Sequence, residues 1–591
     1  MFLRYTTRKK NGKEHRYYSL VENRRLAGGR VVQRHVLYLG EINDTQQEAW
    51  RKTIEIFDEG QTRPRTVALF PEDRIGPVDD ADIVRIRLNQ LSLHRPRQWG
   101  ACWLASQLWE QLGLDRFWAE RLPPSRKGTP WDWVLQILVM YRLLDPGSEW
   151  RLYRHWFEHS AMADLLGADL AVADIHKLYE CHERLLAHKG ALFTHLTQQW
   201  KDLFNARFEV LLYDLTSTHF ESDPPFPEGD KRRHGYSRDK RPDCVQVAIA
   251  LIVTPEGFPL AYEVLAGNTS DKTTLADFLK KIEEQYGKAE RIWVMDRGIP
   301  TESVLVEMRA AQPPVQYLVG TPRGRLSQYE QRLTQLPWQA VRQGVSVKLL
   351  VEDQELYVLA ESTDRVNKER AMRRRQLKAL WQRLKELQQM KLKRDELLKK
   401  LGAALHDYPM GARLIQASVA PEVAQLFFTL RKDKLRQARK REGRYLLRSN
   451  ITSGRSAEEL WQFYIQLTEI EAAFKSLKDD LALRPIHHQW EHRIEAHIFI
   501  SFVACCLHVT LRRRLRDWAP GLTPRTVLEK CGTMQMLDVH LPTTDGRTVI
   551  LSRYTQPEAD VQRLLQRLKL ALPAQPPPKI TGPNLPVRPT L

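Results

Sequence analysis

The chain has 591 residues, several times the ~150 residues of an ordinary domain, so several folding units are expected. Its 91 Lys and Arg residues outnumber 72 Asp and Glu residues, and the resulting net charge of +19 favours a polyanionic partner. The six cysteines lack paired spacing and no apolar run reaches the ~20 residues of a membrane span, which excludes a disulfide framework and a membrane protein and indicates a cytoplasmic setting.

The first two segments differ in their hydrophobic period. Residues 1–90 contain short alternating runs such as Arg30–Leu39, bounded by glycines, and predict a small β-rich module. In residues 91–205 aromatic and aliphatic side chains recur at helical spacing, for example Trp103, Leu104, Leu108 and Leu112, and predict a helical domain.

Residues 206–320 predict the first part of a catalytic core. We expect two strands that each end in a carboxylate, a hairpin between them, and a helix before the last strand. The corresponding segments are Phe208–Asp214, Val245–Val253, Pro259–Leu265, Lys272–Tyr286 and Arg291–Asp296. Three antiparallel strands, a helix and a fourth strand is the order of a ribonuclease-H-like α/β core, a mixed sheet flanked by helices.

Residues 321–443 predict an inserted, basic β/α domain. A hairpin of Val345–Val351 and Leu356–Ala360 precedes a long helix whose leucines at 377, 380, 384 and 387 indicate packing on its own domain. Arg365–Lys400 contains fourteen Lys or Arg against four acidic residues, and Arg431–Arg448 nine against two. Such runs are usually only solvated surface, but this density favours contact with phosphates.

The core is expected to resume in residues 444–520. We predict a strand at Arg444–Arg448, an amphipathic helix at Ala457–Lys478, and a helix at Glu491–Arg514 whose apolar part is a buried core helix. Residues 521–572 form a C-terminal region. The tail, residues 573–591, carries seven prolines and is expected to be disordered or extended.

Three carboxylates are candidates for metal binding and catalysis: Asp214, Asp296 and Glu471. Phosphodiester chemistry uses two divalent ions about 3.5 to 4 Å apart, held by hard oxygen ligands. With 72 acidic residues, spacing alone has little weight, so the local context decides. Each Asp closes an apolar strand, where an unpaired charge would be costly. For each alone, a strand-end cap explains the residue equally well; together they favour a metal site.

Several segments carry a resemblance that extends over about 270 residues. They are YDLTSTHFE around Asp214, HGYSRDKRPD at 234–243, LAYEVLAGNTSDKTTL at 260–275, VMDRGI at 294–299 and YIQLTEIEAAFKSLK at 464–478. In these segments the chain resembles the DDE-type insertion-sequence transposases of the group with the signature Y-x-x-R-x-x-x-E-x-x-x-x-x-x-K. Tyr464, Glu471 and Lys478 fit this signature, but Leu467 stands at the arginine position.

The resemblance implies a function. It implies cleavage of double-stranded DNA at transposon ends and strand transfer by the freed 3′-hydroxyl, with two Mg²⁺, or Mn²⁺ in their place, held by Asp214, Asp296 and Glu471. It also implies a homodimer that pairs two ends, end recognition by the N-terminal 200 residues including the helical domain, and an insertion after residue 320. Tyr464 and Lys478 would bind phosphates at the transposon end, as would the arginine of the signature. Leu467, which stands at the arginine position, cannot do so.

Further DNA contacts are expected from basic residues near the core. Arg238, Lys240 and Arg241 belong to a glycine-containing basic loop that begins at Lys231, and Arg297 follows Asp296. Since Lys478 lies seven residues, two helical turns, after Glu471, one face of a continuous helix could hold metal and phosphate together. Without the resemblance over the other segments, Lys478 would be better interpreted as a surface lysine and Tyr464 as a core residue.

Three other functions compete with this one. His488–His492 (HQWEH) fits the H-x-x-E-H zinc motif of inverted metallopeptidases, but the sequence offers no third ligand, and packing behind Glu471 explains this helix better. A ribonuclease-H-like nuclease or resolvase would use the same carboxylates without joining DNA. A catalytically silent DNA-binding relative is the third alternative, against which the three retained carboxylates argue.

Overall fold

A computed structural model gives the fold of the chain. It describes residues 2–10, 13–25, 31–42, 46–47, 84–206, 208–221, 226–237, 239, 241–269, 280, 283, 291–296, 299–321, 328–329, 332–333, 335–421, 423–484 and 486–581. The chain divides into two compact units. The first comprises Met1–Pro96, Leu537–Arg553 and Ala574–Leu591, and the second comprises Arg97–Met536 and Tyr554–Pro573.

The first unit is β-rich, as predicted for the N-terminus. Its first sheet is an antiparallel meander of β1 (Phe2–Lys10), β2 (Lys13–Arg25) and β3 (Val31–Gly40). A second sheet, in the order β18-β17-β16-β4, contains β4 (Ser92–Gln98), β16 (Gln535–Pro542), β17 (Thr548–Tyr554) and β18 (Lys579–Thr581). The predicted extended tail therefore contributes one short strand, β18.

The helical domain predicted before the core is present in the second unit. Its main helices are α2 (Gly100–Gln111), α3 (Leu114–Arg121), α4 (Trp131–Leu144), α8 (Ile175–Leu185) and α9 (Lys189–Phe204), with the single turn α5 (Glu149–Arg151) between α4 and α8. Their aromatic side chains are buried, including Trp109, Trp118 and Trp200. These rings build the core that the helical spacing predicted.

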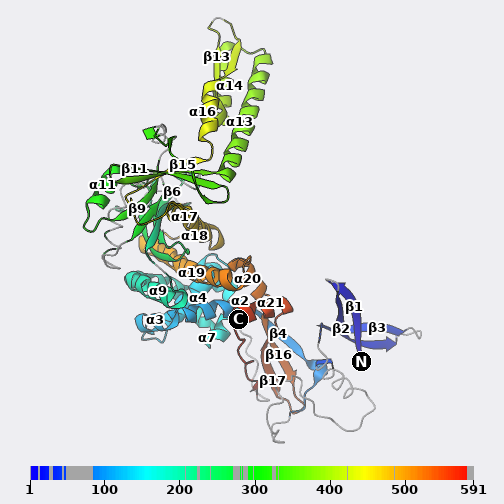
Figure 1. Cartoon of the computed structure of the whole chain (residues 1–591). Coiled ribbons are helices and arrows are strands. Elements are labelled where there is room, and N and C mark those ends of the chain that lie inside the picture. Colours follow the sequence, from blue (N-terminus) through cyan, green and yellow to red (C-terminus); the bar gives the residue numbers. More distant parts are fainter. Residues whose placement is uncertain are drawn as a thin grey trace. The chain divides into compact units, whose positions relative to one another are not determined.

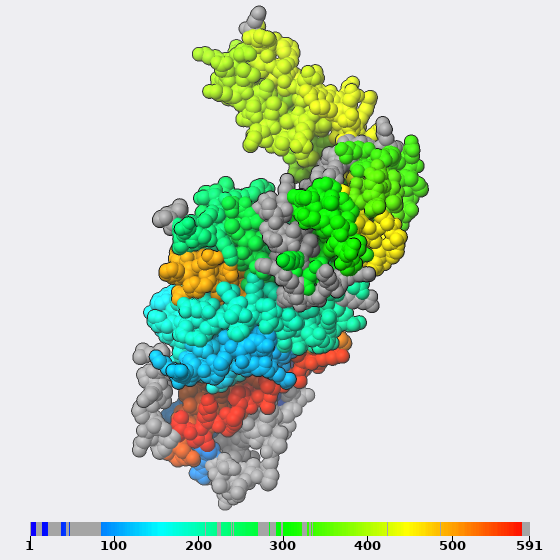
Figure 2. Space-filling model, turned by 90° about the vertical axis from the view of Figure 1, so that its left-hand side faces the viewer, coloured from blue at the N-terminus to red at the C-terminus, as the bar shows by residue number. Residues whose placement is uncertain are grey.

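The long helix α19 (Glu491–Trp518) lies at the centre of this unit, against α2, α4 and α8 on one side and β7 (Pro259–Ala266) on the other (Figure 1). It is long and apolar enough to cross a membrane, but its most apolar stretch is 94% buried in the fold, as expected of a core helix. In Figure 2 the orange segment that contains α19 shows only a small patch between the green strands and the cyan helices.

The segment predicted to be the catalytic core is a mixed sheet. In it, β7, β6 (Val245–Val253), β5 (Val210–Phe220), β8 (Ile292–Met295) and β9 (Gln316–Gly320) lie side by side in that order. The pairs of β5 with β6 and of β6 with β7 are antiparallel, and β8 runs parallel to both β5 and β9. Helix α11 (Glu302–Ala310) connects β8 to β9. This is the ribonuclease-H-like order, so the predicted fold class is confirmed.

The sheet continues beyond β9, because β15 (Arg444–Ser449) pairs with β9 and is followed by β12 (Glu355–Ser362), β11 (Val345–Glu352) and β10 (Gln339–Arg342). All of these added pairs are antiparallel. The hairpin predicted within the insertion, β11 and β12, thus extends the core sheet together with β10 and β15, and the described residues of this sheet form nine strands.

The rest of the insertion is an arm of residues 363–443. It contains α13 (Thr363–Gln389), α14 (Arg394–Asp407), α15 (Pro409–Ala412), the hairpin of β13 (Ile415–Val419) and β14 (Leu426–Leu430), and α16 (Lys432–Arg441). Leu380, Leu384 and Leu387 of α13 are buried in a core that belongs to the arm. The long helix therefore packs on its own neighbours, as predicted, and the arm stands apart from the sheet (Figures 1 and 2).

Two predicted element boundaries are wrong. The strand that was expected to end at Asp214 continues to Phe220, because its Thr-rich second half stays paired with β6. The single helix predicted for 457–478 is divided at Gln466 into α17 (Ala457–Ile465) and α18 (Leu467–Lys475), with a π-helical turn at Ser476–Asp480.

The buried stripes of the two helices explain this division. Leu460 and Trp461 of α17 and Ile470 and Phe474 of α18 are buried. At ~100° per residue these pairs fall on different faces of a straight helix, so the break at Gln466 allows both to reach the core. The helix predicted at Lys272–Tyr286 lies outside the described residues except for Lys280 and Glu283.

Candidate active site

Asp214, Asp296 and Glu471 line one cavity of about 280 Å³. They come from a central strand, the end of its parallel neighbour and a helix that packs on the sheet. The structure therefore brings together all three carboxylates that the sequence singled out.

The register of the sheet places the two aspartates next to each other. Strands β5 and β8 are paired in parallel up to Tyr213 and Met295, so Asp214 and Asp296 are the next residues in line. Asp214 Oδ1 accepts a hydrogen bond from the Leu215 amide at 2.8 Å. Strand β5 continues beyond Asp214, whereas its parallel neighbour β8 ends at Met295. The cavity opens at this end of β8.

Helix α18 packs on β5 and β6 and carries two glutamates that differ in environment. Glu471 is exposed and lines the cavity. Glu469 pairs with Arg512 at 2.9 Å and Arg516 at 3.5 Å, both on α19. Of these two glutamates, the one that matches the signature is the one that lines the cavity with the aspartates.

Tyr464, at the end of α17, is a hydrogen-bond donor to the carboxylate cluster. Its hydroxyl donates to Asp296 Oδ1 at 3.4 Å, and its ring stacks on Tyr445 with centroids 5.8 Å apart. Burial, and then the charge of Asp296, raises the pKa of Tyr464 well above its ordinary value. The phenol therefore stays protonated and can orient the carboxylate.

Lys478, predicted to grip phosphate, does not line the cavity in this structure. Its Nζ lies 2.8 Å from Asp239 Oδ1, and its side chain is 11% exposed. Arg484 also pairs with Asp239, and His219 Nδ1 lies 3.8 Å from the other carboxylate oxygen. Burial acts to raise the pKa of Asp239, but the hydrogen bonds from Lys478 and Arg484 outweigh it and hold that pKa below its ordinary value.

Two arginines that the sequence did not single out share the cavity with Leu467, the residue at the signature's arginine position. Arg365, in the first turn of α13, lies over the Tyr445 ring with its Cζ 4.8 Å from the centroid. Arg444, the first residue of β15, donates from Nε to Glu361 at 2.6 Å. Both belong to the basic runs, where no sequence pattern distinguished them from their neighbours.

The predicted DNA-contact loop is anchored by ion pairs. Arg241 contacts Asp243 at 2.9 Å and Glu221 at 3.0 Å, and it is 38% exposed. Of the other basic residues that begin this loop, Lys231 pairs with Glu491 and Glu495 of α19, and Arg232 is buried against Asp230. Arg238, Lys240 and Arg297, the remaining predicted contacts, lie outside the described residues.

The H-x-x-E-H motif does not form the two-histidine face of a peptidase. His488 precedes α19 and is buried near Glu149, with Nε2 3.3 Å from Oε1. His492, on α19, is 49% exposed and lies 3.9 Å from Glu183. The two histidines therefore have different carboxylate partners, and the peptidase alternative loses its basis.

Comparisons with known proteins assign a family. Residues 3–67 match the model of the IS1634 family transposase N-terminal domain, and residues 206–507, more than half of the chain, match the transposase DDE domain. A search of the curated proteins finds no match. The chain is similar to a cryo-EM structure of the piggyBac transposase synaptic complex with hairpin DNA, at 10% identity and a TM-score of 0.34, over 75% of this chain and 82% of that chain. By the DDE-domain match the chain belongs to the DDE-type transposases of insertion sequences.

Proposed function

We propose that this transposase cleaves double-stranded DNA at the ends of its element and joins the freed 3′-hydroxyl to target DNA, with Asp214, Asp296 and Glu471 as the catalytic residues. The observation that carries the proposal is that these three carboxylates line a single cavity. That cavity is open to the surface of α18, where Glu471 is exposed, so a DNA strand can approach it.

The residues of the cavity are suited to bind two divalent ions, which would be Mg²⁺ or, as a substitute, Mn²⁺. Asp214, Asp296 and Glu471 supply the hard oxygen ligands that these ions prefer, and none of the described residues that line the cavity is a cysteine or a histidine. Bound there, the ions would activate the attacking oxygen and stabilise the leaving one. Tyr464 holds the Asp296 carboxylate by its hydroxyl, which reduces the rearrangement needed when the site is filled.

Arg365 and Arg444 are proposed to bind the DNA phosphates that the signature arginine would bind in related transposases. Both arginines line the cavity together with Leu467, whose apolar side chain cannot bind a phosphate. Arginine suits the task because its planar group donates two parallel hydrogen bonds to one phosphate. The arm would thus be connected to the active site at both of its ends, through the start of α13 and the start of β15.

Pairing of two element ends by a homodimer and end recognition by the N-terminal domain complete the proposal. Both follow from membership of the family, and the match of residues 3–67 to a separate N-terminal transposase domain supports the second. The proteins of this family act on DNA, so we expect the chain to be associated with DNA in the cell.

A strand-transfer assay tests the proposed reaction. Purified full-length protein is incubated with labelled DNA that carries the element's own ends, in Mg²⁺, in Mn²⁺ or in EDTA. We expect joined products in both metals and none in EDTA, and loss of cleavage in Asp214→Asn and Asp296→Asn. Nicking without joining would identify a nuclease or resolvase, and end binding without cleavage in either metal would identify a silent relative.

A further inference from the structure

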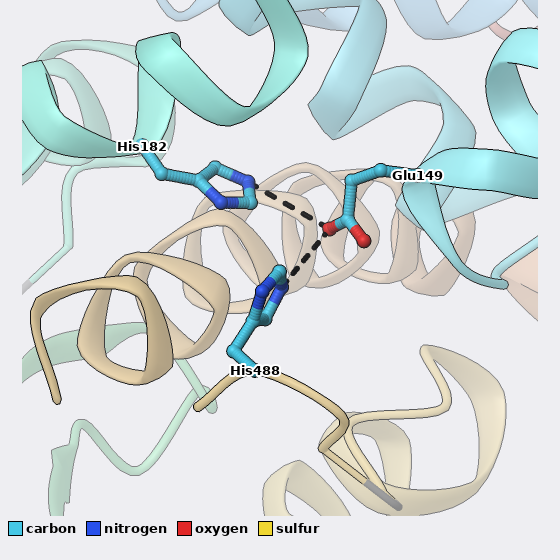
Figure 3. Close-up of side chains that lie close together, drawn as sticks. All are labelled: Glu149, His182 and His488. Atoms are coloured by element: carbon cyan, nitrogen blue, oxygen red, sulfur yellow. Dashed lines mark hydrogen bonds and ion pairs between the residues drawn. The ribbon is translucent and has the colours of Figure 1, made fainter. Parts of the chain in front are cut away.

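A second cluster of metal-binding side chains lies away from the active-site cavity. Glu149, His182 and His488 offer a carboxylate oxygen and two imidazole nitrogens that all lie within 4.8 Å of one another. His182 Nε2 is 3.7 Å and His488 Nε2 is 3.3 Å from Glu149 Oε1. Figure 3 shows the two rings turned toward the same carboxylate.

The cluster is buried, and one of its histidines lacks hydrogen-bond partners. The His182 side chain is 0% exposed, and those of Glu149 and His488 are each 8% exposed. Among the described residues, neither ring nitrogen of His182 has a hydrogen-bond partner. Leaving a buried polar group unsatisfied costs about 1 to 3 kcal/mol, so a buried imidazole in this state points to a ligand that would satisfy it.

Two neighbours complete the environment. His497 Nδ1, on α19, lies 3.9 Å from the same Glu149 oxygen and offers a third nitrogen, which would be the fourth donor. Arg142 Nη2 approaches His497 Nδ1 at 3.4 Å, while its Nη1 donates to the Ala482 carbonyl at 3.2 Å. Without a metal, Arg142 would be the cation that balances Glu149, so this arrangement is the alternative that an experiment must exclude.

We propose that a structural transition-metal ion, most directly Zn²⁺, is bound by Glu149, His182 and His488, with His497 as the fourth donor. Nitrogen and carboxylate donors in a closed four-coordinate set are typical of zinc. Donor atoms bonded at about 2.0 to 2.1 Å to a tetrahedral ion are about 3.4 Å apart, close to the spacings of 3.3 and 3.7 Å found around Glu149 Oε1.

The proposed site would connect two parts of the second unit. Glu149 and His182 belong to the helical domain, while His488 lies in the segment that links the Glu471 helix to α19. None of these residues lines the active-site cavity. The ion would therefore stabilise the position of the segment that follows Glu471, and would not take part in the reaction.

Metal analysis of the full-length protein tests this site. Protein purified without a polyhistidine tag is dialysed against dilute EDTA, and its zinc is measured by mass spectrometry. The Asp214→Asn, Asp296→Asn background removes metal binding at the active site. We expect about one zinc per chain, and loss of zinc in Glu149→Gln and in His488→Gln. His492→Gln, four residues after His488 and outside the cluster, is the control and should keep its zinc.

Cobalt provides a readout that does not depend on the folding of the Glu149 and His488 variants. Replacing zinc by Co²⁺ in the same background should give the strong visible absorption of a four-coordinate ion with nitrogen ligands. Removal of the metal should lower the melting temperature. The proposal is overturned if this protein holds far less than one zinc per chain and gives no such cobalt spectrum, or if Glu149→Gln and His488→Gln bind as much zinc as His492→Gln.

Discussion

At the scale of single residues, the two glutamates of α18 have opposite expected effects. Glu471→Gln should abolish cleavage in the strand-transfer assay, because Glu471 lines the cavity with the two aspartates. Glu469→Gln should retain cleavage, since Glu469 faces Arg512 and Arg516; it should instead lower the free energy of unfolding by about 1 to 2 kcal/mol, because its side chain is only 16% exposed. Retained activity in Glu471→Gln would contradict the assignment of the third carboxylate.

Arg365 and Arg444 should act on DNA affinity. We expect Arg365→Ala and Arg444→Ala each to weaken binding to the element's ends and to reduce by about one the slope of log affinity against log salt, because each removes one phosphate contact. Fluorescence anisotropy over a range of salt concentrations measures both quantities. Arg436→Ala is the control, since Arg436 is a 74% exposed arginine of the arm that does not line the cavity. If all three variants behave alike, the proposed contacts are wrong.

The buried His508 should make stability depend on pH. Burial lowers its pKa to about 4 from an ordinary value of 6.5, against the opposing effect of Asp480, which lies 3.9 Å away. Between these values the unfolded chain binds a proton that the folded chain does not, so the stability is complete above pH 6.5 and falls as the pH drops toward 4.

Comparison with His508→Gln isolates this effect from the other titrating groups. The difference in unfolding free energy between wild type and variant should be constant above pH 7. Between pH 6 and pH 4.5, the wild type should lose about 1.4 kcal/mol of unfolding free energy per pH unit relative to the variant. Urea unfolding over this pH range measures the difference, and parallel curves for the two proteins would contradict it.

At the scale of elements, a buried ion network joins the added strands to the ribonuclease-H-like core. Arg448 of β15 contacts Glu355 of β12 at 2.6 Å and Glu302 of α11 at 2.7 Å. Tyr317 of β9 donates to the same Glu355. The network therefore fixes β15, at whose start Arg444 lies, and β12, after which α13 and Arg365 begin.

Breaking this network should be costly. Arg448→Met should lower the free energy of unfolding by about 1.5 to 3 kcal/mol, because it removes one of the two arginines that pair with the buried Glu355 and leaves Arg309 as its remaining cation. The double variant Glu355→Gln, Arg448→Met should recover part of this loss, since it removes both charges. Denaturant unfolding measures the stability of the single and double variants. The pairing would be refuted if the double variant lost more unfolding free energy than the two single variants lose together.

The sequence predicts the strands and their order better than it predicts where they end. The apolar runs before Asp214 and Asp296 identify β5 and β8, and their register then places the two carboxylates side by side. The continuation of β5 to Phe220 depends on its pairing with β6, which a local pattern does not contain. The break at Gln466 likewise depends on which residues of α17 and α18 are buried.

The residues that the sequence missed become neighbours only through the fold. Arg365 and Arg444 are indistinguishable from other basic residues until α13 and β15 bring them to the cavity. Glu149, His182 and His488 come from segments that lie up to 339 residues apart in the chain. The H-x-x-E-H pattern drew attention to His488 for a different reason, since its second histidine has another partner.

At the scale of the whole molecule, the proposed active site and the N-terminal domain belong to different folding units. The three carboxylates, the arm and α19 all lie in the second unit. The residues that match the N-terminal transposase domain belong to the first, where β1, β2 and β3 form a sheet of their own. The sheet that contains β4, β16, β17 and β18 does not use these strands. This organisation makes the contribution of the N-terminal domain separable by truncation.

A chain that begins at residue 84 should therefore fold and keep its chemistry while it loses its preference for the element's ends. It retains β4, which pairs in the second sheet, and the whole of the catalytic unit. We expect a cooperative thermal transition, metal-dependent nicking of DNA, and equal affinity for the element's ends and for scrambled DNA of the same length. Competition binding compares the two DNAs. If the shortened chain still prefers the ends, recognition must come from residues 84–591, and the helical domain becomes its most direct candidate.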